Sequence, residues 1–296
     1  MNLLLVPLLF IIWKAFDFLV IFLSQKVIPY LGFFPYKDRL PGYNLPSWLS
    51  SLANFDGIYY VSIARHGYSQ YEQAFFPLYP LLIKFLAPLF SNNQLFIGII
   101  ISNVSFLLGL WIFIKYLRLI LTNSNKFQLI LMLIFLLAFP TSFFFGAVYT
   151  EGLFFFLLTS TLYFLKKEKY LLVAVFAFLA SLTRLVGVFL IIPIVFHLFN
   201  KYQISKIENK KYILNIKNSI LIAPLLGLGI YCFYLWQTTG DPFFFLTSQP
   251  VFGANRSSNL VLLPQVYWRY FKIFFTATHD FRFYISFIEF TIFSFV

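Results

Sequence analysis

The sequence has little charge and almost no cysteine. Charged residues make up 11% of its 296 residues, whereas a soluble domain carries about 25%. The single cysteine, Cys232, excludes a disulfide within this chain and a cysteine-based metal site. Hydrophobic residues make up 60%, and several apolar runs reach the roughly 18–20 residues that cross a bilayer. The composition therefore predicts an all-α polytopic membrane protein with no separate soluble domain.

Several motifs of soluble enzymes are also missing. The sequence has no glycine-rich phosphate loop, no Gly-x-Ser-x-Gly elbow and no Asp-x-Asp pair of the kind that holds a nucleotide-sugar metal. His197 and His279 are isolated and lack the helical spacing of a metal site. We therefore predict neither a metal ion nor a cofactor.

The net charge of +12 comes from lysine and arginine grouped between apolar runs. Such groups mark the cytoplasmic loops of membrane proteins, so we interpret them as topology signals and predict no nucleic-acid partner. The groups lie at 115–126, 166–169 and 201–217. With these in the cytoplasm, the turn at Tyr149 lies outside, together with two long polar loops at about 24–74 and 238–278.

The apolar runs predict a single transmembrane domain over residues 1–296. Spans are predicted at 3–23, 95–114, 127–147, 150–165 and 220–236. Residues 75–90 contain three prolines, so we predict an interfacial or re-entrant segment. A further span begins at 281 and runs to the end of the sequence, which suggests a truncated chain.

Residues 171–199 form an apolar run with basic groups at both ends and Arg184 near its middle. A segment with cytoplasmic signals at both ends should not cross the membrane once. We therefore predict two half-helices that meet near Thr183 and Arg184. A single crossing in which Arg184 snorkels to the interface is the open alternative.

Three ionisable residues from distant segments fall on the outer side in this topology: Asp56, Glu151 and Arg184. Each also has an ordinary structural interpretation. Asp56 precedes Gly57 and can serve a turn or a helix start, and Glu151 suits a helix N-terminus. Arg184 needs an anionic partner at membrane depth, either a side chain or a substrate phosphate.

Other charged residues have weaker signals. Arg65 and His66 follow Asp56 in the same loop and suit a phosphate ligand, although such residues are usually only solvated. Lys14 and Asp17 lie three residues apart within the first apolar run, and so on one helical face. We interpret them as a mutually neutralised pair, because charges inside membranes usually pair.

Six short segments carry a resemblance to a known family. They read Phe55-Asp56-Gly57-Ile58-Tyr59-Tyr60, Ile63-Ala64-Arg65-His66-Gly67-Tyr68, Ala74-Phe75-Phe76-Pro77-Leu78-Tyr79-Pro80, Phe139-Pro140-Thr141-Ser142, Tyr149-Thr150-Glu151 and Leu182-Thr183-Arg184-Leu185-Val186-Gly187. In this order they resemble the GPI mannosyltransferase II (PIG-V) family and its prokaryotic relatives, membrane glycosyltransferases of the GT-C class. The similarity runs from about 54 to 241. Phe55 stands where relatives usually have Trp, and Leu185 where they often have Pro.

The resemblance implies a GT-C-like helix bundle with a long first extracytoplasmic loop. It also implies transfer of a sugar, typically mannose, from a polyprenyl-phosphate donor to a glycolipid or glycan acceptor. An inverting reaction needs a base for the acceptor hydroxyl, which Asp56 fits, and a cation for the leaving phosphate, which Arg184 fits. Glu151, Arg65, His66 and Tyr60 are the further candidates for substrate binding.

The implied location is a multi-pass protein in the cell membrane of a prokaryote or the endoplasmic reticulum of a eukaryote. The competing hypothesis is a transporter or flippase of lipid-linked substrates, because broken helices and charges at membrane depth suit transport as well.

Overall fold

A computed structural model describes residues 5–27, 36–204, 210–252 and 261–295. The described residues form α-helices and short 3₁₀ helices, with no strand among them. Two compact units are present, Met1–Phe245 and Leu246–Val296. The prediction of an all-α membrane protein is confirmed.

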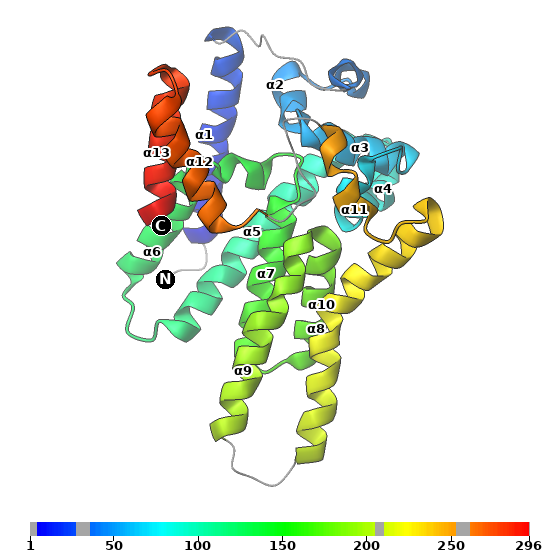
Figure 1. Ribbon diagram of the computed structural model, residues 1–296, viewed down its shortest axis with the longest axis vertical. Helices are drawn as coiled ribbons and strands as arrows, with labels where there is room; N and C mark the ends of the chain where they lie inside the picture. Colours follow the sequence, from blue (N-terminus) through cyan, green and yellow to red (C-terminus); the bar gives the residue numbers. More distant parts are fainter. Residues whose placement is uncertain (1–4, 28–35, 205–209, 253–260, 296) are drawn as a thin grey trace. The chain divides into compact units, whose positions relative to one another are not determined.

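The first unit is built on four helices that pack in series: α5 (Gln94–Ile120), α7 (Glu151–Lys166), α8 (Tyr170–Thr183) and α10 (Lys210–Thr239). α5 packs against α7, α7 against α8, and α8 against α10 (Figure 1). Small residues permit close contact between membrane helices. At Gly152, an added Cβ would lie 2.5 Å from the Phe145 carbonyl oxygen and 2.6 Å from that of Ser102. α7 therefore meets α5 backbone to backbone at its first turn.

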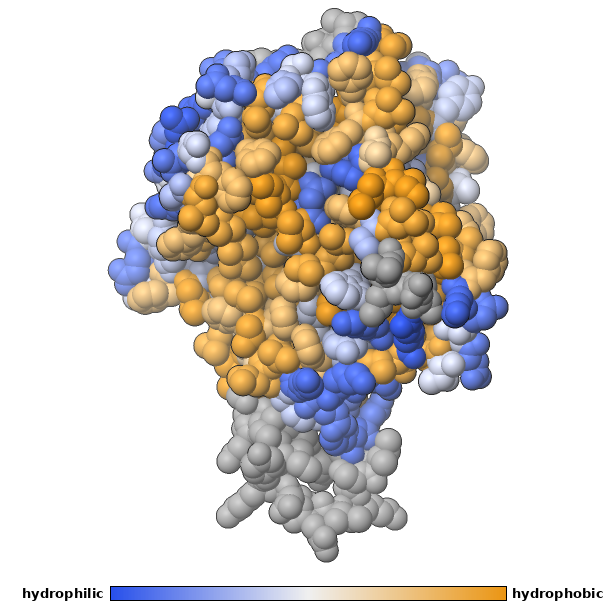
Figure 2. All heavy atoms as spheres, turned by 180° about the vertical axis from the view of Figure 1, so that it is seen from behind, coloured by the Kyte–Doolittle hydropathy of each residue, from blue (hydrophilic) through white to orange (hydrophobic). Residues whose placement is uncertain are grey.

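Within the described ranges, three helical segments are long and apolar enough to cross a membrane. They are α1 (Leu5–Val27), α5, and Ile220–Thr239 within α10. Three of the predicted spans, 3–23, 95–114 and 220–236, fall on these helices. Large apolar side chains on their outer faces remain exposed, such as Ile11 (61%) on α1 and Trp236 (56%) on α10. Apolar residues cover much of the face seen in Figure 2, as expected for contact with lipid.

The predicted span at 127–147 is wrong as a continuous helix. α6 (Lys126–Ala138) ends early, and the short η5 (Ser142–Gly146) follows. Phe139, which precedes Pro140, is extended, with φ −65° and ψ 134°. Proline disfavours the helical conformation of the residue before it, so the helix ends at the residue before Phe139.

The predicted loop at 24–74 contains several short helices. α1 continues to Val27, and residues 28–35 lie outside the described part of the chain. The remaining elements are η1 (Lys37–Tyr43), α2 (Ser47–Ser50), η2 (Ser51–Ala53), α3 (Asp56–His66) and η3 (Glu72–Ala74). α3 packs against α4 (Leu78–Leu86), which η4 (Ala87–Phe90) extends. The segment at 75–90 is therefore short and helical, and its place at the membrane surface stays a prediction.

The predicted break in the 171–199 run is confirmed. α8 ends at Thr183, Arg184 is extended (φ −153°, ψ 146°), and η6 (Leu185–Leu190) leads into α9 (Ile191–Ile204). Lys201 near the end of α9 pairs with Glu168 and donates to the Tyr170 hydroxyl (3.3 Å) at the start of α8. The chain therefore turns back on itself, and one straight crossing is excluded. Gly187 permits the turn, since an added Cβ would lie 2.4 Å from the Ala180 backbone.

The predicted loop at 238–278 is also partly wrong. α10 runs to Thr239, and α11 (Phe244–Thr247), η7 (Gln249–Phe252) and α12 (Leu263–Thr276) follow. The second unit pairs α12 with α13 (Phe281–Phe295), which lies in the last predicted span. Aromatic contacts join them, including Phe274 against Phe287 with ring centroids 5.6 Å apart. Pro264 in the first turn of α12 is a helix-start signal that the sequence analysis missed.

Candidate active site

Asp56 is the first residue of α3, the helix-start position that its structural interpretation required. The residue before it, Phe55, has φ 56° and ψ −117° and makes no side-chain capping bond. A positive φ is costly for a bulky non-glycine residue, on the order of 1–3 kcal/mol. Such strain persists only where the surrounding structure holds the residue in this conformation. The conformation of Phe55 sets the direction in which the chain enters α3.

The short segment 147–150, which joins η5 to α7, holds the start of α3. The Val148 N–H donates to the Leu52 carbonyl oxygen (2.9 Å), and the Tyr149 hydroxyl donates to the Asn54 carbonyl oxygen (2.9 Å). The Tyr149 hydroxyl also lies within reach of the backbone N–H groups of Asp56 and Gly57. Burial raises the pKa of Tyr149, so its hydroxyl remains a neutral donor. Tyr149 was expected to lie in an outer turn and belongs to one of the family segments, but its contact with the start of α3 was not predicted.

Glu151 and Arg184 form an ion pair between the start of α7 and the break after α8. Arg184 Nη1 also donates to the Thr150 hydroxyl (3.3 Å). The side chains of Arg184 and Glu151 are 39% and 28% exposed, so the pair is open to a ligand. Among the described residues, the buried Glu151 Oε2 has no hydrogen-bond partner. The anionic partner that the sequence analysis required for Arg184 is therefore a side chain in this structure.

Tyr60 of α3 lies near these groups. It is buried beside the Thr150 hydroxyl, and it lies within electrostatic reach of Glu151, Asp56 and Arg184. Burial raises the pKa of Tyr60, so its hydroxyl stays protonated at physiological pH. The structure therefore brings together the three charged residues that the predicted topology placed on one side. We refer to Asp56, Tyr60, Tyr149, Glu151 and Arg184 as the Asp56 cluster.

Arg65 and His66 are not part of this cluster. They lie in the last turn of α3, about 14 Å along the helix axis from Asp56 at 1.5 Å per residue. The Arg65 guanidinium lies 5.9 Å from the centre of the Tyr43 ring, and His66 lies near the buried Glu72. Two of the predicted binding residues therefore form a separate group at the far end of α3.

A cavity of about 380 Å³ lies against the C-terminal half of α3 and the residues that follow it, and its lining includes no member of the Asp56 cluster. Its lining comes from α3, α4, α8 and α10 and is mostly apolar, with Lys84 as its charged residue. Two lining residues connect it to the cluster: Ile63 follows Tyr60 by less than one helical turn, and Leu182 precedes Arg184 by two residues. We call it the apolar cavity.

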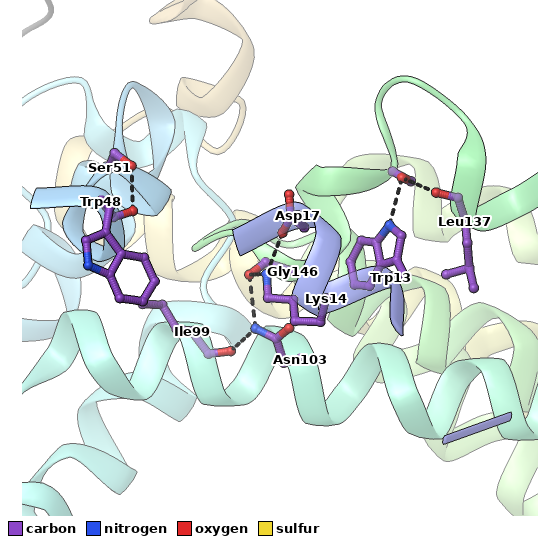
Figure 3. A network of polar contacts seen from close by, with 10 residues as sticks. Trp13, Lys14, Asp17, Trp48, Ser51, Ile99, Asn103, Leu137 and Gly146 are labelled. Atoms are coloured by element: carbon purple, nitrogen blue, oxygen red, sulfur yellow. Dashed lines mark hydrogen bonds and ion pairs between the residues drawn. The ribbon is translucent and has the colours of Figure 1, made fainter. Parts of the chain in front are cut away.

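A buried polar network fixes the segment that carries Tyr149 and Glu151 (Figure 3). Lys14 pairs with Asp17 (2.7 Å), which confirms the predicted neutralised pair, and donates to the Gly146 carbonyl oxygen (3.2 Å). Asn103 Nδ2 of α5 donates to the same oxygen (3.0 Å). Two side chains from different helices therefore hold the backbone just before the 147–150 segment.

The charged groups of the Asp56 cluster are two carboxylates and a guanidinium. In the part of the chain that the structure describes, no three His, Cys, Asp or Glu side chains gather into a metal-binding group. The chemistry that the cluster itself supplies is proton transfer by a carboxylate and binding of an anion by Arg184.

Residues 43–241 of the 296 match the model of a family described as Mannosyltransferase (PIG-V). The matched range includes every member of the Asp56 cluster, the apolar cavity, and the separate group at Arg65 and His66. No curated protein and no solved structure matches the chain.

Proposed function

The chain belongs to the mannosyltransferase (PIG-V) family, and from this premise we propose that the Asp56 cluster is its catalytic site. Membership makes it a membrane glycosyltransferase. We propose that it moves mannose from a polyprenyl-phosphate donor to a hydroxyl of a glycan or glycolipid acceptor, with inversion at the anomeric carbon.

The convergence of Asp56, Glu151 and Arg184 around the Tyr60 hydroxyl carries this proposal. Asp56 and Glu151 are the first residues of α3 and α7, so two helix N-termini meet at the cluster. Helix N-termini favour anions through their N–H groups and dipoles. The site therefore combines a proton acceptor with three features that suit a phosphate: two helix ends and a guanidinium.

In the proposed reaction, the acceptor hydroxyl oxygen attacks the anomeric carbon of the donor sugar. Asp56 takes the hydroxyl proton as the new bond forms. The bond between the anomeric carbon and the phosphate oxygen breaks through an oxocarbenium-like transition state. The polyprenyl phosphate leaves with the electron pair, and Arg184 stabilises its negative charge.

Arg184 keeps donors for this task. Both of its contacts to Glu151 and Thr150 use Nη1, whereas an arginine presents further N–H groups on Nε and Nη2. Glu151 orients the guanidinium, and the neutral Tyr60 hydroxyl is placed to bond a sugar hydroxyl. Arg65 and His66, farther along α3, would contact a more distant part of the acceptor.

The apolar cavity supports a lipid-linked donor. Its walls include Leu182 and Ile230 and suit a hydrocarbon chain, and Leu182 precedes Arg184, the proposed phosphate ligand, by two residues. The sequence has none of the glycine-rich or Asp-x-Asp motifs with which soluble enzymes hold nucleotide sugars. The donor would reach the cluster through the bilayer.

The basic groups also support an outer location for the Asp56 cluster in a multi-pass topology. Glu151 and Lys166 lie at opposite ends of α7, about 22 Å apart at 1.5 Å per residue. With Lys166 and its neighbours in the cytoplasm, the Asp56 cluster faces the extracytoplasmic side.

The test is turnover of the full-length Asp56→Asn variant with a labelled polyprenyl-phosphate mannose and candidate acceptors. Asn keeps the size of Asp and its capacity to begin a helix, so we expect unfolding to change by about 1 kcal/mol or less. Loss of the proton acceptor should lower turnover by roughly 10²–10⁴. Asp38→Asn is the matched control, because Asp38 is an exposed acid of η1 outside the cluster.

Near-normal turnover in Asp56→Asn would make Asp56 a helix-start residue and Glu151 the leading base. If the wild-type protein moves the donor across the membrane and leaves it chemically intact, the transporter hypothesis replaces the transferase.

A further inference from the structure

A second cavity, of about 640 Å³, lies where α5 and α7 end and α9 returns. Its polar lining is Tyr116, Lys166, Glu168, His197, Asn200 and Lys201. Its apolar lining is Ile120, Leu162, Leu165, Pro193 and Phe196. It shares no lining residue with the apolar cavity, and it lies at the end of α7 opposite Glu151. We call it the basic cavity.

The polar side of the basic cavity suits an anion. Lys166, Lys201 and Glu168 all lie within electrostatic reach of His197. Glu168 pairs with Lys201, so one acid faces two lysines. His197 Nε2 is buried and has no hydrogen-bond partner in the described part of the chain. A buried polar atom without a partner is costly, and a ligand oxygen that accepts from His197 would remove that cost.

The apolar side of the basic cavity indicates where the anion comes from. Leu162 and Leu165 of α7 and Phe196 of α9 form its wall, and Phe196 is 65% exposed. A small soluble anion would gain nothing from this wall, whereas an acyl chain would cover it. Basic pockets between membrane helices on the cytoplasmic side bind anionic lipid headgroups.

We propose that the basic cavity binds the phosphate headgroup of an anionic membrane lipid. Lys166 and Lys201 contact the phosphate as charge-assisted donors, and His197 donates from Nε2 as a neutral imidazole. The acyl chains lie along Phe196 and the α7 leucines. This site is independent of the proposed transfer reaction, because the ligand and the cavity differ from those of the Asp56 cluster.

The experiment exchanges the purified full-length protein into vesicles of phosphatidylcholine with a minority of phosphatidylglycerol, then counts retained lipids by native mass spectrometry. We expect the wild type to retain phosphatidylglycerol in preference to phosphatidylcholine. Lys166→Gln with Lys201→Gln should weaken retention by about tenfold or more, since two charge-assisted hydrogen bonds are lost.

Lys167→Gln with Lys169→Gln is the matched control. It removes the same number of charges, both from the basic group that contains Lys166, but neither residue lines the cavity, so we expect retention within about twofold of wild type. Asn200→Asp is a second test, because Asn200 is exposed and the change should not disturb folding. It places a negative charge at the cavity and should also reduce retention.

Three results would overturn the proposal. Equal retention of phosphatidylglycerol and phosphatidylcholine by the wild type would show that the basic cavity does not select an anionic lipid. An equal loss of phosphatidylglycerol retention in both double variants would show that the lipid is attracted to the basic surface as a whole. Displacement of phosphatidylglycerol by inorganic phosphate at matched concentration would show that a soluble phosphate, and not a lipid, is the ligand.

Discussion

Two of the ion pairs among the described residues are built differently. Lys14 and Asp17 lie three residues apart on α1, their side chains are each 9% exposed, and Lys14 also bonds the Gly146 carbonyl oxygen. Glu151 and Arg184 come from two elements, are 28% and 39% exposed, and leave Glu151 Oε2 without a partner among the described residues. The first pair is closed to solvent, and the second is open.

The difference separates a structural role from a reactive one. The Lys14–Asp17 pair is buried on α1, and the bond from Lys14 to the Gly146 carbonyl oxygen also holds it to η5, so it is closed to a ligand (Figure 3). The Glu151–Arg184 pair joins a helix start to a helix break. Its side chains are open to solvent, so in the proposed function a substrate phosphate reaches the remaining donors of Arg184 while Glu151 orients the guanidinium. A charge in an apolar chain is therefore a candidate for function when its ion pair is open to a ligand.

The largest expected effect on stability comes from Lys14→Met. Removal of one partner of a buried ion pair leaves an uncompensated charge, here Asp17, and typically costs about 3–5 kcal/mol. The measurement is the free energy of unfolding in detergent micelles. Asp17→Leu added to Lys14→Met should recover much of the loss, because well-packed apolar residues can replace a buried pair. If the free energy of unfolding falls by less than about 1 kcal/mol in Lys14→Met, the ion pair with Lys14 is not what stabilises the buried Asp17 side chain.

A smaller effect, on catalysis, is expected from Arg184→Lys. Lysine keeps the charge but loses the planar fork that binds phosphate at two points. Loss of one charge-assisted hydrogen bond lowers kcat/KM for the lipid-linked donor by about 10- to 100-fold. Unfolding should change by about 1 kcal/mol or less, because exposed ion pairs contribute little.

Arg39→Lys is the control for this change. Arg39 lies in η1, donates to the Ser62 hydroxyl (3.2 Å) and is not part of the Asp56 cluster. Equal losses of kcat/KM in Arg184→Lys and Arg39→Lys would mean that catalysis is sensitive to arginine-to-lysine changes outside the Asp56 cluster as well. Such a result would not identify Arg184 as the phosphate ligand.

The smallest effect concerns Glu72, a buried acid without an ion pair among the described residues. Its Oε2 accepts from the Ser69 N–H (2.9 Å), and its buried Oε1 has no hydrogen-bond partner in that part of the chain. Burial raises the pKa of Glu72, so the folded state binds this proton more tightly than the unfolded state. The resulting stability is fully present below the unfolded pKa and is lost as pH rises through the folded pKa.

Glu72→Gln should therefore be more stable than the wild type at neutral pH. Below about pH 4, Glu72 is protonated in both the folded and the unfolded wild type, so the two proteins should have similar stability. Unfolding curves across this pH range provide the measurement. If the stability of the wild type relative to Glu72→Gln instead rises with pH through this window, folding lowers the pKa of Glu72, opposite to the direction expected here.

Much of the fold follows from residue patterns along the chain. The apolar runs on α1, α5 and α10 are continuous, and basic groups at both ends of 171–199 predicted the turn that Arg184 makes. The errors arose where one residue outweighs its neighbours. Pro140 ends α6 inside an apolar run, and α12 forms in a segment whose polar residues suggested a loop.

The Asp56 cluster was predicted in part. Asp56, Glu151 and Arg184 were found because a charge in an apolar chain is conspicuous and the topology placed all three on one side. The position of Tyr149 was missed, since a neutral residue in a turn gives no signal in sequence. The separate position of Arg65 and His66 was not predicted, because the helical form of α3, which puts them about 14–15 Å along the axis from Asp56, does not show in the loop-like composition of that segment.

Turnover per folded molecule, compared between Asp56→Asn and the Lys14→Met/Asp17→Leu double variant, tests the separation of roles most directly. We expect Asp56→Asn to lose roughly 10²–10⁴ in turnover while it stays folded. The double variant, once folded, should keep turnover within about tenfold of wild type, because its pair is replaced by packed apolar residues. Near-normal turnover in Asp56→Asn, or an equal loss in the folded double variant, would contradict a catalytic role for Asp56 and a structural role for the Lys14–Asp17 pair.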